Sequence, residues 1–254
     1  MKKKINFKEV FPNFITILGL CLGISSIKFA FELNFEKSVY CIVLAAILDA
    51  IDGRIARFLK STSKFGAELD ALVDFVNFGI SPALILYFYK LNTLPKFGWI
   101  LCLVFIICAC LRLARFNSSD KLEKNTSDMF FNGVPVPSGA GLILLPIIFS
   151  YSGFSEQNLN MNIFVIFISI TSFLMISKIP TYSLKSFKIS RTAGVILILI
   201  LAIYFIFLYQ FTFETLLISG ILYLLLIPVS FLHYSRYKKK NKNLDDSLIS
   251  DDFI

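Results

Sequence analysis

The residues best suited to chemistry lie in one short stretch, DAIDGRIARFLKSTSKFGAELDALVD, which covers residues 49–74. Asp49 and Asp52 are three residues apart, and Asp70 and Asp74 are four residues apart. On a helix both spacings put the two side chains of a pair on one face. Two helices joined by a short turn lie antiparallel, so we expect the two pairs to face each other. Four converging carboxylates repel one another unless cations lie between them, and oxygen ligands favour Mg²⁺ or Mn²⁺.

The residues between the two aspartate pairs predict a phosphate site. Gly53 and Gly66 lack side chains, so a bulky ligand can approach the backbone there. Arg57 can pair with phosphate oxygens, and the Ser63 hydroxyl can donate a hydrogen bond to the same group. Two carboxylate-bound cations can clamp a phosphate and stabilise both the attacking and the leaving oxygen. The alternative is that the aspartates form structural ion pairs with nearby cations, namely Arg54, Arg57 and Lys64.

The elements that must position these residues are membrane helices. The chain is 56% apolar and only 17% charged, with a mean hydropathy of +0.74, whereas soluble domains are about half apolar and about a quarter charged. A spanning helix needs about 20 mostly apolar residues. We therefore predict an all-α, polytopic membrane protein with about eight transmembrane helices. The predicted spans are 13–31, 38–58, 69–89, 97–116, 134–152, 161–178, 192–210 and 213–234.

The distribution of basic residues predicts the orientation of these spans. All but four of the 25 lysines and arginines fall at the N-terminus, at alternate junctions and at the C-terminus. Cytoplasmic loops collect such residues. We therefore expect both termini and the aspartate cluster on the cytoplasmic side of the cell membrane. Basic residues on the cytoplasmic side favour contact with anionic lipid headgroups. This accounts for the net charge of +8, so we expect no nucleic-acid partner.

The stretch from residue 49 to residue 74 resembles the signature of the CDP-alcohol phosphatidyltransferase family, D-x2-D-G-x2-A-R-x8-G-x3-D-x3-D. The resemblance implies a six-helix catalytic core, two bound divalent metal ions, a CDP-linked lipid donor and a homodimer. It implies that Asp49, Asp52 and Asp70 are metal ligands, and that Asp74 is the general base and also touches metal. The implied contacts to cytidine and diphosphate are Gly53, Arg57, Ser63 and Gly66.

Further stretches are similar to CDP-diacylglycerol–serine O-phosphatidyltransferases of the membrane-embedded type. They are KFGAELDALVDFVNFGISPA, LRLARFN and FNGVPVPSGAGLILLP, and the resemblance runs from about residue 11 to about residue 190. It implies that CDP-diacylglycerol and L-serine react to give phosphatidylserine and CMP. The chain departs from that pattern at Asn77, Ser81 and Pro180.

The acceptor pocket is predicted from charge, because the carboxylate of serine needs a cation. Arg112, Arg115 and Lys178 are available on the predicted cytoplasmic face, and Asn117 adds a neutral hydrogen-bonding group. These residues can instead anchor the chain to lipid headgroups. Other readings are an acceptor such as glycerol phosphate, inositol phosphate or choline, or an ion-binding transporter that uses the same aspartates. The predicted organisation is a catalytic core at 1–190, two additional helices at 191–236 and a disordered cytoplasmic tail at 237–254.

Overall fold

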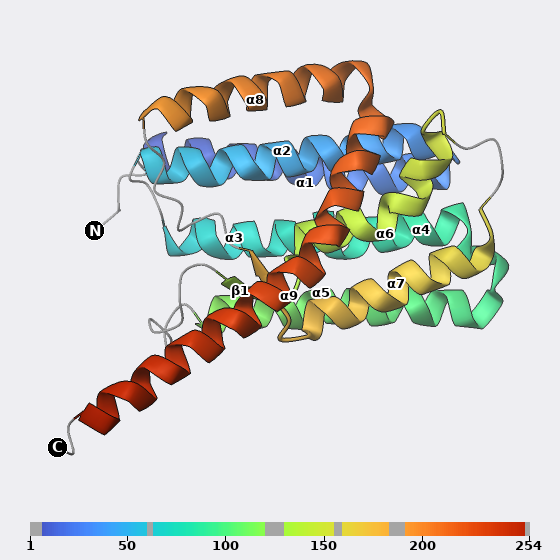
Figure 1. Ribbon diagram of the computed structural model, residues 1–254. Coiled ribbons are helices and arrows are strands. Elements are labelled where there is room, and N and C mark those ends of the chain that lie inside the picture. The colour runs from blue at the N-terminus through green and yellow to red at the C-terminus, as the bar shows by residue number, and fades with distance from the viewer. Residues whose placement is uncertain (1–6, 60–62, 120–129, 155–158, 183–190, 252–254) are drawn as a thin grey trace. The chain divides into compact units, whose positions relative to one another are not determined.

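The protein forms two compact units in the computed structural model, which describes residues 7–59, 63–119, 130–154, 159–182 and 191–251 (Figure 1). The first unit consists of residues 1–123 and 135–176, and the second consists of residues 124–134 and 177–254.

The prediction of an all-α membrane protein is confirmed, since each predicted span corresponds to one helical rod. The third rod is a continuous succession of α3, a π-helical turn η1 and α4. The helices of the first unit are α1 (Phe7–Phe31), α2 (Phe35–Phe58), α3 (Lys64–Asp74), η1 (Phe75–Ile80), α4 (Ser81–Tyr89), η2 (Leu91–Thr93), α5 (Pro95–Ser119), α6 (Val136–Tyr151) and α7 (Met161–Ile176). Those of the second unit are α8 (Arg191–Gln210) and α9 (Thr212–Asp251).

Several of these helices are long and apolar enough to cross a bilayer. Among the described residues, such spans are Val10–Phe31, Lys64–Tyr89, Lys96–Asn117 and Thr212–Ser235, and shorter apolar helices cover Val136–Tyr151, Met161–Ile176 and Gly194–Gln210. The exception is α2, because two aspartates and two arginines fall within its last three turns. Among the described helices, the long one left out because of its charged residues is therefore the one that carries half of the signature.

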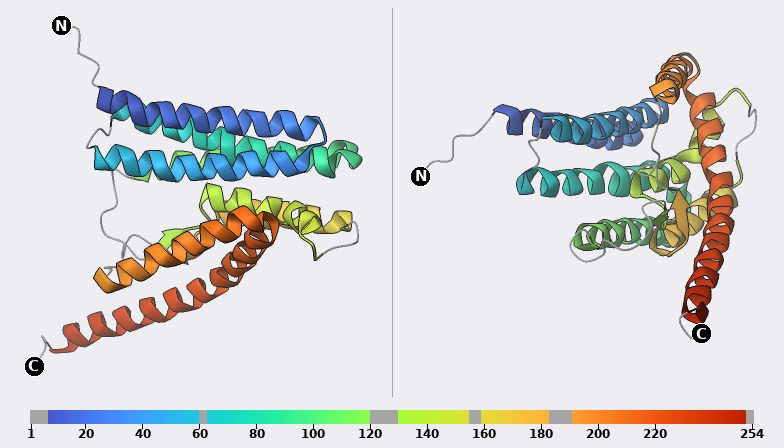
Figure 2. Two further views of the ribbon diagram at one scale, coloured as in Figure 1. Left: turned by 90° about the horizontal axis from the view of Figure 1, so that it is seen from above. Right: turned by 60° about the vertical axis from the view of Figure 1, so that its left-hand side comes forward.

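In the first unit, α1 is the helix against which the signature helices pack. It lies alongside α2 and also contacts α3, η1 and α4 (Figures 1 and 2). Asn34 begins α2 by accepting a hydrogen bond from the backbone N–H of Lys37 at 3.3 Å, as an N-cap residue does. The two helices therefore form a tight antiparallel pair. α6 is the most buried helix and packs on α4 and α7, while α5 packs on α7.

The second unit adds a feature that an all-α prediction does not contain, a pair of three-residue strands. β1 (Phe130–Asn132) pairs antiparallel with β2 (Pro180–Tyr182). Gly133, with a φ of 78°, follows β1, and its carbonyl accepts a hydrogen bond from the Thr181 hydroxyl at 2.9 Å. Pro180 begins β2 and pairs with Asn132, a position that proline tolerates because it lies at the strand end. β2 packs on α9, and α9 packs on α8.

The end of α9 differs from the sequence-based expectation. A disordered tail was predicted from residue 237, whereas the helix continues to Asp251. The physical reason is that the segment after Val229 holds neither glycine nor proline, so no residue terminates a helix that has already formed. The apolar part of α9 ends at Ser235.

Candidate active site

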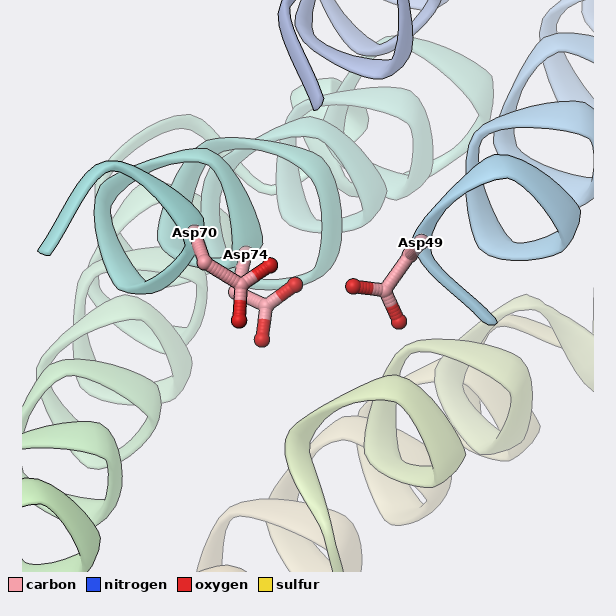
Figure 3. Close-up of side chains that lie close together, drawn as sticks. All are labelled: Asp49, Asp70 and Asp74. Carbon is pink, nitrogen blue, oxygen red and sulfur yellow. The ribbon is translucent and has the colours of Figure 1, made fainter. Parts of the chain in front are cut away.

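Three carboxylates from two helices meet in the first unit. Asp49 extends from α2, and Asp70 and Asp74 extend from α3 (Figure 3). Each offers one carboxylate oxygen, and these three oxygens all lie within 4.8 Å of one another. All three side chains are half-buried. Figure 3 shows Asp70 and Asp74 on one face of α3, directed toward Asp49 across the gap between the helices.

The local sequence explains this meeting. Asp70 and Asp74 are one helical turn apart and therefore share a face. The chain reverses between Phe58 and Lys64, so the end of α2 lies opposite the start of α3. The prediction that carboxylates from the two sides of this turn face each other is confirmed for these three residues.

Asp52 is not part of this cluster. It is 4% exposed and lies beside Thr16 of α1. A spacing of three residues rotates a side chain about 60° around the helix axis from the starting position. That rotation turns Asp52 from the gap between α2 and α3 toward α1. Three of the four carboxylates therefore meet within 4.8 Å, and Asp52 lies beside them, near enough for its charge to act on Asp49, Asp70 and Asp74.

The cluster has no positive partner within the described chain. No described lysine or arginine lies within 4.0 Å of these carboxylates. The ion pair that the described residues do contain lies elsewhere and joins Lys28 to Glu32. The alternative that the aspartates form structural ion pairs with Arg54, Arg57 or Lys64 is therefore not what the structure contains. Oδ1 of Asp74 is buried and receives no hydrogen bond from any described residue. An all-oxygen cluster with an unsatisfied buried oxygen fits a hard divalent cation.

The predicted phosphate contacts lie at the ends of α2 and α3. A Cβ atom on Gly53 would meet nothing within 4 Å, so space for a ligand is open there. Arg57 is exposed, and its Nε donates a hydrogen bond to the Gly53 carbonyl at 2.9 Å. This bond holds the guanidinium stem along α2 beside the open face of Gly53.

Ser63 and Gly66 have structural roles in addition to the predicted ligand contacts. Ser63 is the N-cap of α3, and its hydroxyl accepts a hydrogen bond from the Gly66 N–H at 3.0 Å. A Cβ atom on Gly66 would lie 3.0 Å from Oδ1 of Asn13. Gly66 therefore lies where the Asn13 side chain of α1 closely approaches the start of α3.

Three of the predicted acceptor-binding residues, Arg112, Arg115 and Asn117, lie on α5. Arg112 is half-buried, and its Nη1 donates a hydrogen bond to the Met175 carbonyl at 3.2 Å. A cation there satisfies a carbonyl in the last turn of α7. Arg115 is half-buried and Asn117 is exposed on the same helix. Lys178 is exposed and belongs to the second unit.

Two residues of α1 border the site and had no role in the sequence analysis. Asn13 lies against Gly66, and Thr16 lies beside Asp52. They are three residues apart and so share a face of α1. The available signal was a pair of polar residues at helical spacing inside an apolar span.

Comparison with known proteins places this site in a family. Residues 9–162 match the family model described as CDP-alcohol phosphatidyltransferase, which is more than half of the chain. The matched residues include all of α2, α3 and the three-carboxylate cluster.

Curated relatives carry one common name, CDP-diacylglycerol–serine O-phosphatidyltransferase. The chain is 36% identical to the protein from Mycobacterium leprae over 202 residues, which cover 77% of this chain and 66% of the relative. It is 34% identical to the protein from Helicobacter pylori over 203 residues, which cover 80% of this chain and 84% of the relative. The Bacillus subtilis protein is 36% identical over 141 residues, covering 56% of this chain and 76% of the relative. The chain thus spans about two thirds of the mycobacterial protein's length.

Proposed function

The chain belongs to the CDP-alcohol phosphatidyltransferase family, and we propose that it transfers a phosphatidyl group from CDP-diacylglycerol to the hydroxyl of L-serine. The products are phosphatidylserine and CMP. The observation that carries this proposal is the cluster of three carboxylates within 4.8 Å, without a positive partner among the described residues. The curated relatives, which share the name of a serine phosphatidyltransferase, support the choice of acceptor.

The proposed metal ligands are Asp49, Asp70 and Asp74, together with Asp52 from the family signature. When bound, two divalent cations, Mg²⁺ or Mn²⁺, would neutralise the negative charge of the diphosphate and of the carboxylates. The side chains of the protein align the substrates and accept the proton.

Asp74 is the proposed general base. Its Oδ1 receives no hydrogen bond from a described residue, which leaves the carboxylate open to an incoming group. It accepts the proton of the serine hydroxyl, and the freed oxygen attacks the β-phosphorus of the donor. The new phosphorus–oxygen bond forms as the bond to the bridging oxygen breaks, and CMP leaves with that electron pair. Most of the rate enhancement comes from alignment of the reacting atoms and from charge stabilisation.

Substrate binding is assigned to the residues around the cluster. Gly53 and Gly66 give the nucleotide access to the backbone, and Arg57 and Ser63 contact the diphosphate. Arg112, Arg115, Asn117 and Lys178 are the proposed contacts to the serine carboxylate or to phosphate. The guanidinium of Arg112 also donates to the Met175 carbonyl at the end of α7.

The membrane location, the orientation and the assembly of the protein are part of the same proposal. The chain is a multi-pass protein of the cell membrane, with both termini and the active site on the cytoplasmic side. Its proposed assembly is a homodimer, to be tested by its mass in detergent. Orientation can be tested by labelling cysteines introduced at either end with a membrane-impermeant reagent.

The deciding experiment uses membranes that contain the protein, incubated with labelled serine and CDP-diacylglycerol, with and without Mn²⁺. We expect a labelled lipid only when both the donor and the metal are present. Parallel incubations replace serine by labelled glycerol phosphate, inositol phosphate or choline. Labelling by one of those alcohols instead of serine would reject the acceptor, and no labelled lipid with any alcohol would reject the proposed reaction.

A further inference from the structure

A π-helical turn follows the last carboxylate of the site without a break. η1 covers Phe75–Ile80 and begins directly after Asp74. At its end the backbone N–H of Ser81 donates to the carbonyl of Val76, five residues back. A π-turn holds one residue more than an α-helical turn, so it changes the rotation of α3 relative to α4. The directions of Asp70 and Asp74 therefore depend on how this turn is held.

Asn77 is the polar side chain at the centre of that turn, and it is buried against α1. It is 1% exposed. Its amide fits over Gly19 and Gly23, which are one turn apart on α1. A Cβ on Gly19 would lie 3.6 Å from Nδ2 of Asn77, whereas a Cβ on Gly23 would overlap Oδ1 and lie 2.8 Å from Cγ. Only a glycine at position 23 leaves room for this amide.

A second contact ties the same turn to the same glycine. The buried Ser81 hydroxyl shares its proton between the carbonyls of Val76, at 2.9 Å, and Gly23, at 3.0 Å. The Gly23 carbonyl also accepts a hydrogen bond from the Ser26 hydroxyl at 2.6 Å. The π-turn is thus fixed to one point of α1 by an amide that fills a notch and by a hydroxyl that bonds the backbone.

The amide of Asn77 is not explained by packing alone. Its Oδ1 is buried and receives no hydrogen bond from any described residue, although burying an unpaired polar atom is costly. An apolar side chain of the same size would fill the notch without that cost. The fit of this amide against Gly19 and Gly23 is therefore the feature of the turn to be explained.

We propose that Asn77 is a positioning residue that fits over Gly23 and sets the rotation of α3, and so holds Asp70 and Asp74 opposite Asp49. α1 also touches the other parts of the signature, through Asn13 at Gly66 and Thr16 at Asp52. α1 thereby contacts both helices that carry the carboxylates and positions one relative to the other. The inference rests on the proposed function in one respect, namely that the cluster binds divalent cations.

The test is a double-mutant cycle between Gly23→Ala and Asn77→Ala in purified full-length protein. The readout is the Mn²⁺ concentration that gives half of the metal-induced rise in melting temperature, which needs no substrate or turnover. A methyl group on Gly23 displaces the Asn77 amide, so G23A should raise this midpoint at least about tenfold, the lower end for residues that orient metal ligands. Removing the amide removes the overlap and leaves the Asn77 Cα 3.3 Å from the new methyl, a tight contact that a shift of a few tenths of an ångström accommodates. The double variant should therefore return to within about threefold of N77A, since contacting residues couple.

The control is Gly141→Ala on α6, where a Cβ meets nothing within 4 Å and the midpoint should not change. If G23A does not fold, Asn77→Leu is measured instead, because leucine has a similar size but no amide, and about a tenfold rise is again expected. Suppose that the wild-type protein responds to Mn²⁺ and that a folded G23A or N77L variant has the same midpoint. That result would overturn the inference and leave the proposed function standing. A wild-type protein without any Mn²⁺ response would overturn both.

Discussion

Neutralising one carboxylate of the cluster should stabilise the protein in the absence of metal and remove its response to metal. The change considered is Asp70→Asn, which keeps the size of the side chain and removes its charge. Asp70 takes part in two of the three close pairs, with Asp49 and with Asp74. The same charge that binds a cation destabilises the fold when no cation is present.

The magnitude follows from the distances. Two unit charges 4.8 Å apart repel by about 3.5 kcal/mol at an effective dielectric constant of about 20. Loss of two such pairs removes about 7 kcal/mol when all three groups are ionised. The measured gain is smaller, because protonation of a carboxylate in the metal-free wild type also removes charge. A residual gain of about 1 kcal/mol still raises the melting temperature by about 2–4 °C in a chain of this size.

The assay compares melting temperatures of the two purified proteins in excess EDTA and in a series of Mn²⁺ concentrations. In EDTA, Asp70→Asn should melt above the wild type. With Mn²⁺ the order should reverse, because a cation that binds only the folded wild type stabilises it by RT ln(1 + [Mn²⁺]/Kd). The matched control is Glu68→Gln, which removes one negative charge from an exposed position of the same helix and should change neither result. A variant that melts below the wild type in EDTA, or that keeps its Mn²⁺ response, would refute the reasoning.

Three further predictions address single residues. Asp74→Asn should abolish phosphatidyl transfer and leave binding of the CDP-lipid, measured with a labelled donor, largely intact; normal turnover would reject the base assignment. Ser63→Ala should lose the N-cap of α3 and about 1 kcal/mol of stability, whereas Ser63→Asp should keep the cap and the melting temperature but weaken CDP-lipid binding by repelling the diphosphate; unweakened binding would show that Ser63 serves only as a cap. Gly98→Ala should lower the melting temperature, because its Cβ would overlap the Leu91 carbonyl; an unchanged melting curve would contradict the packing of α5 on η2.

The helices and the pairing of their carboxylates were predictable because both depend on local sequence. Span lengths follow from runs of apolar residues, and the facing of Asp49 with Asp70 and Asp74 follows from helical spacing and one short turn. The π-turn was not predictable in this way. Its sequence, FVNFGI, is compatible with an α-helix, and its hydrogen-bond pattern is held by contacts with Gly23, which is far away in the sequence.

The contribution of α1 to the site was missed for the same physical reason. Which face of α1 meets the signature is decided by packing between helices, as with Asn13 against Gly66. The three-residue spacing predicts that Asp49 and Asp52 share a face of α2, but it does not give the neighbour that Asp52 meets. Predicting Thr16 as that neighbour required the position of α1 as well as its sequence.

The height of the site along its helices follows from helix lengths and an aromatic layer. The Phe35 and Tyr89 rings pack edge to face with centroids 4.9 Å apart, and Tyr87 packs on Trp99 at 5.3 Å. Tyrosine and tryptophan gather where a bilayer meets water, so these rings mark one interface at the start of α2 and the end of α4.

From that layer, Asp49 lies about 21 Å along α2 and Asp74 about 22 Å along the rod of α3, η1 and α4, at 1.5 Å per residue. The hydrocarbon core of a bilayer is about 30 Å thick. Two independent helices therefore hold the carboxylates at a similar height above that layer, within about the thickness of a bilayer core. Carboxylates between membrane helices face the interior of the bundle or a water-filled cavity. In the proposed reaction, the diphosphate of the lipid-linked donor would reach them from the lipid side, while serine and the departing CMP would use the aqueous side.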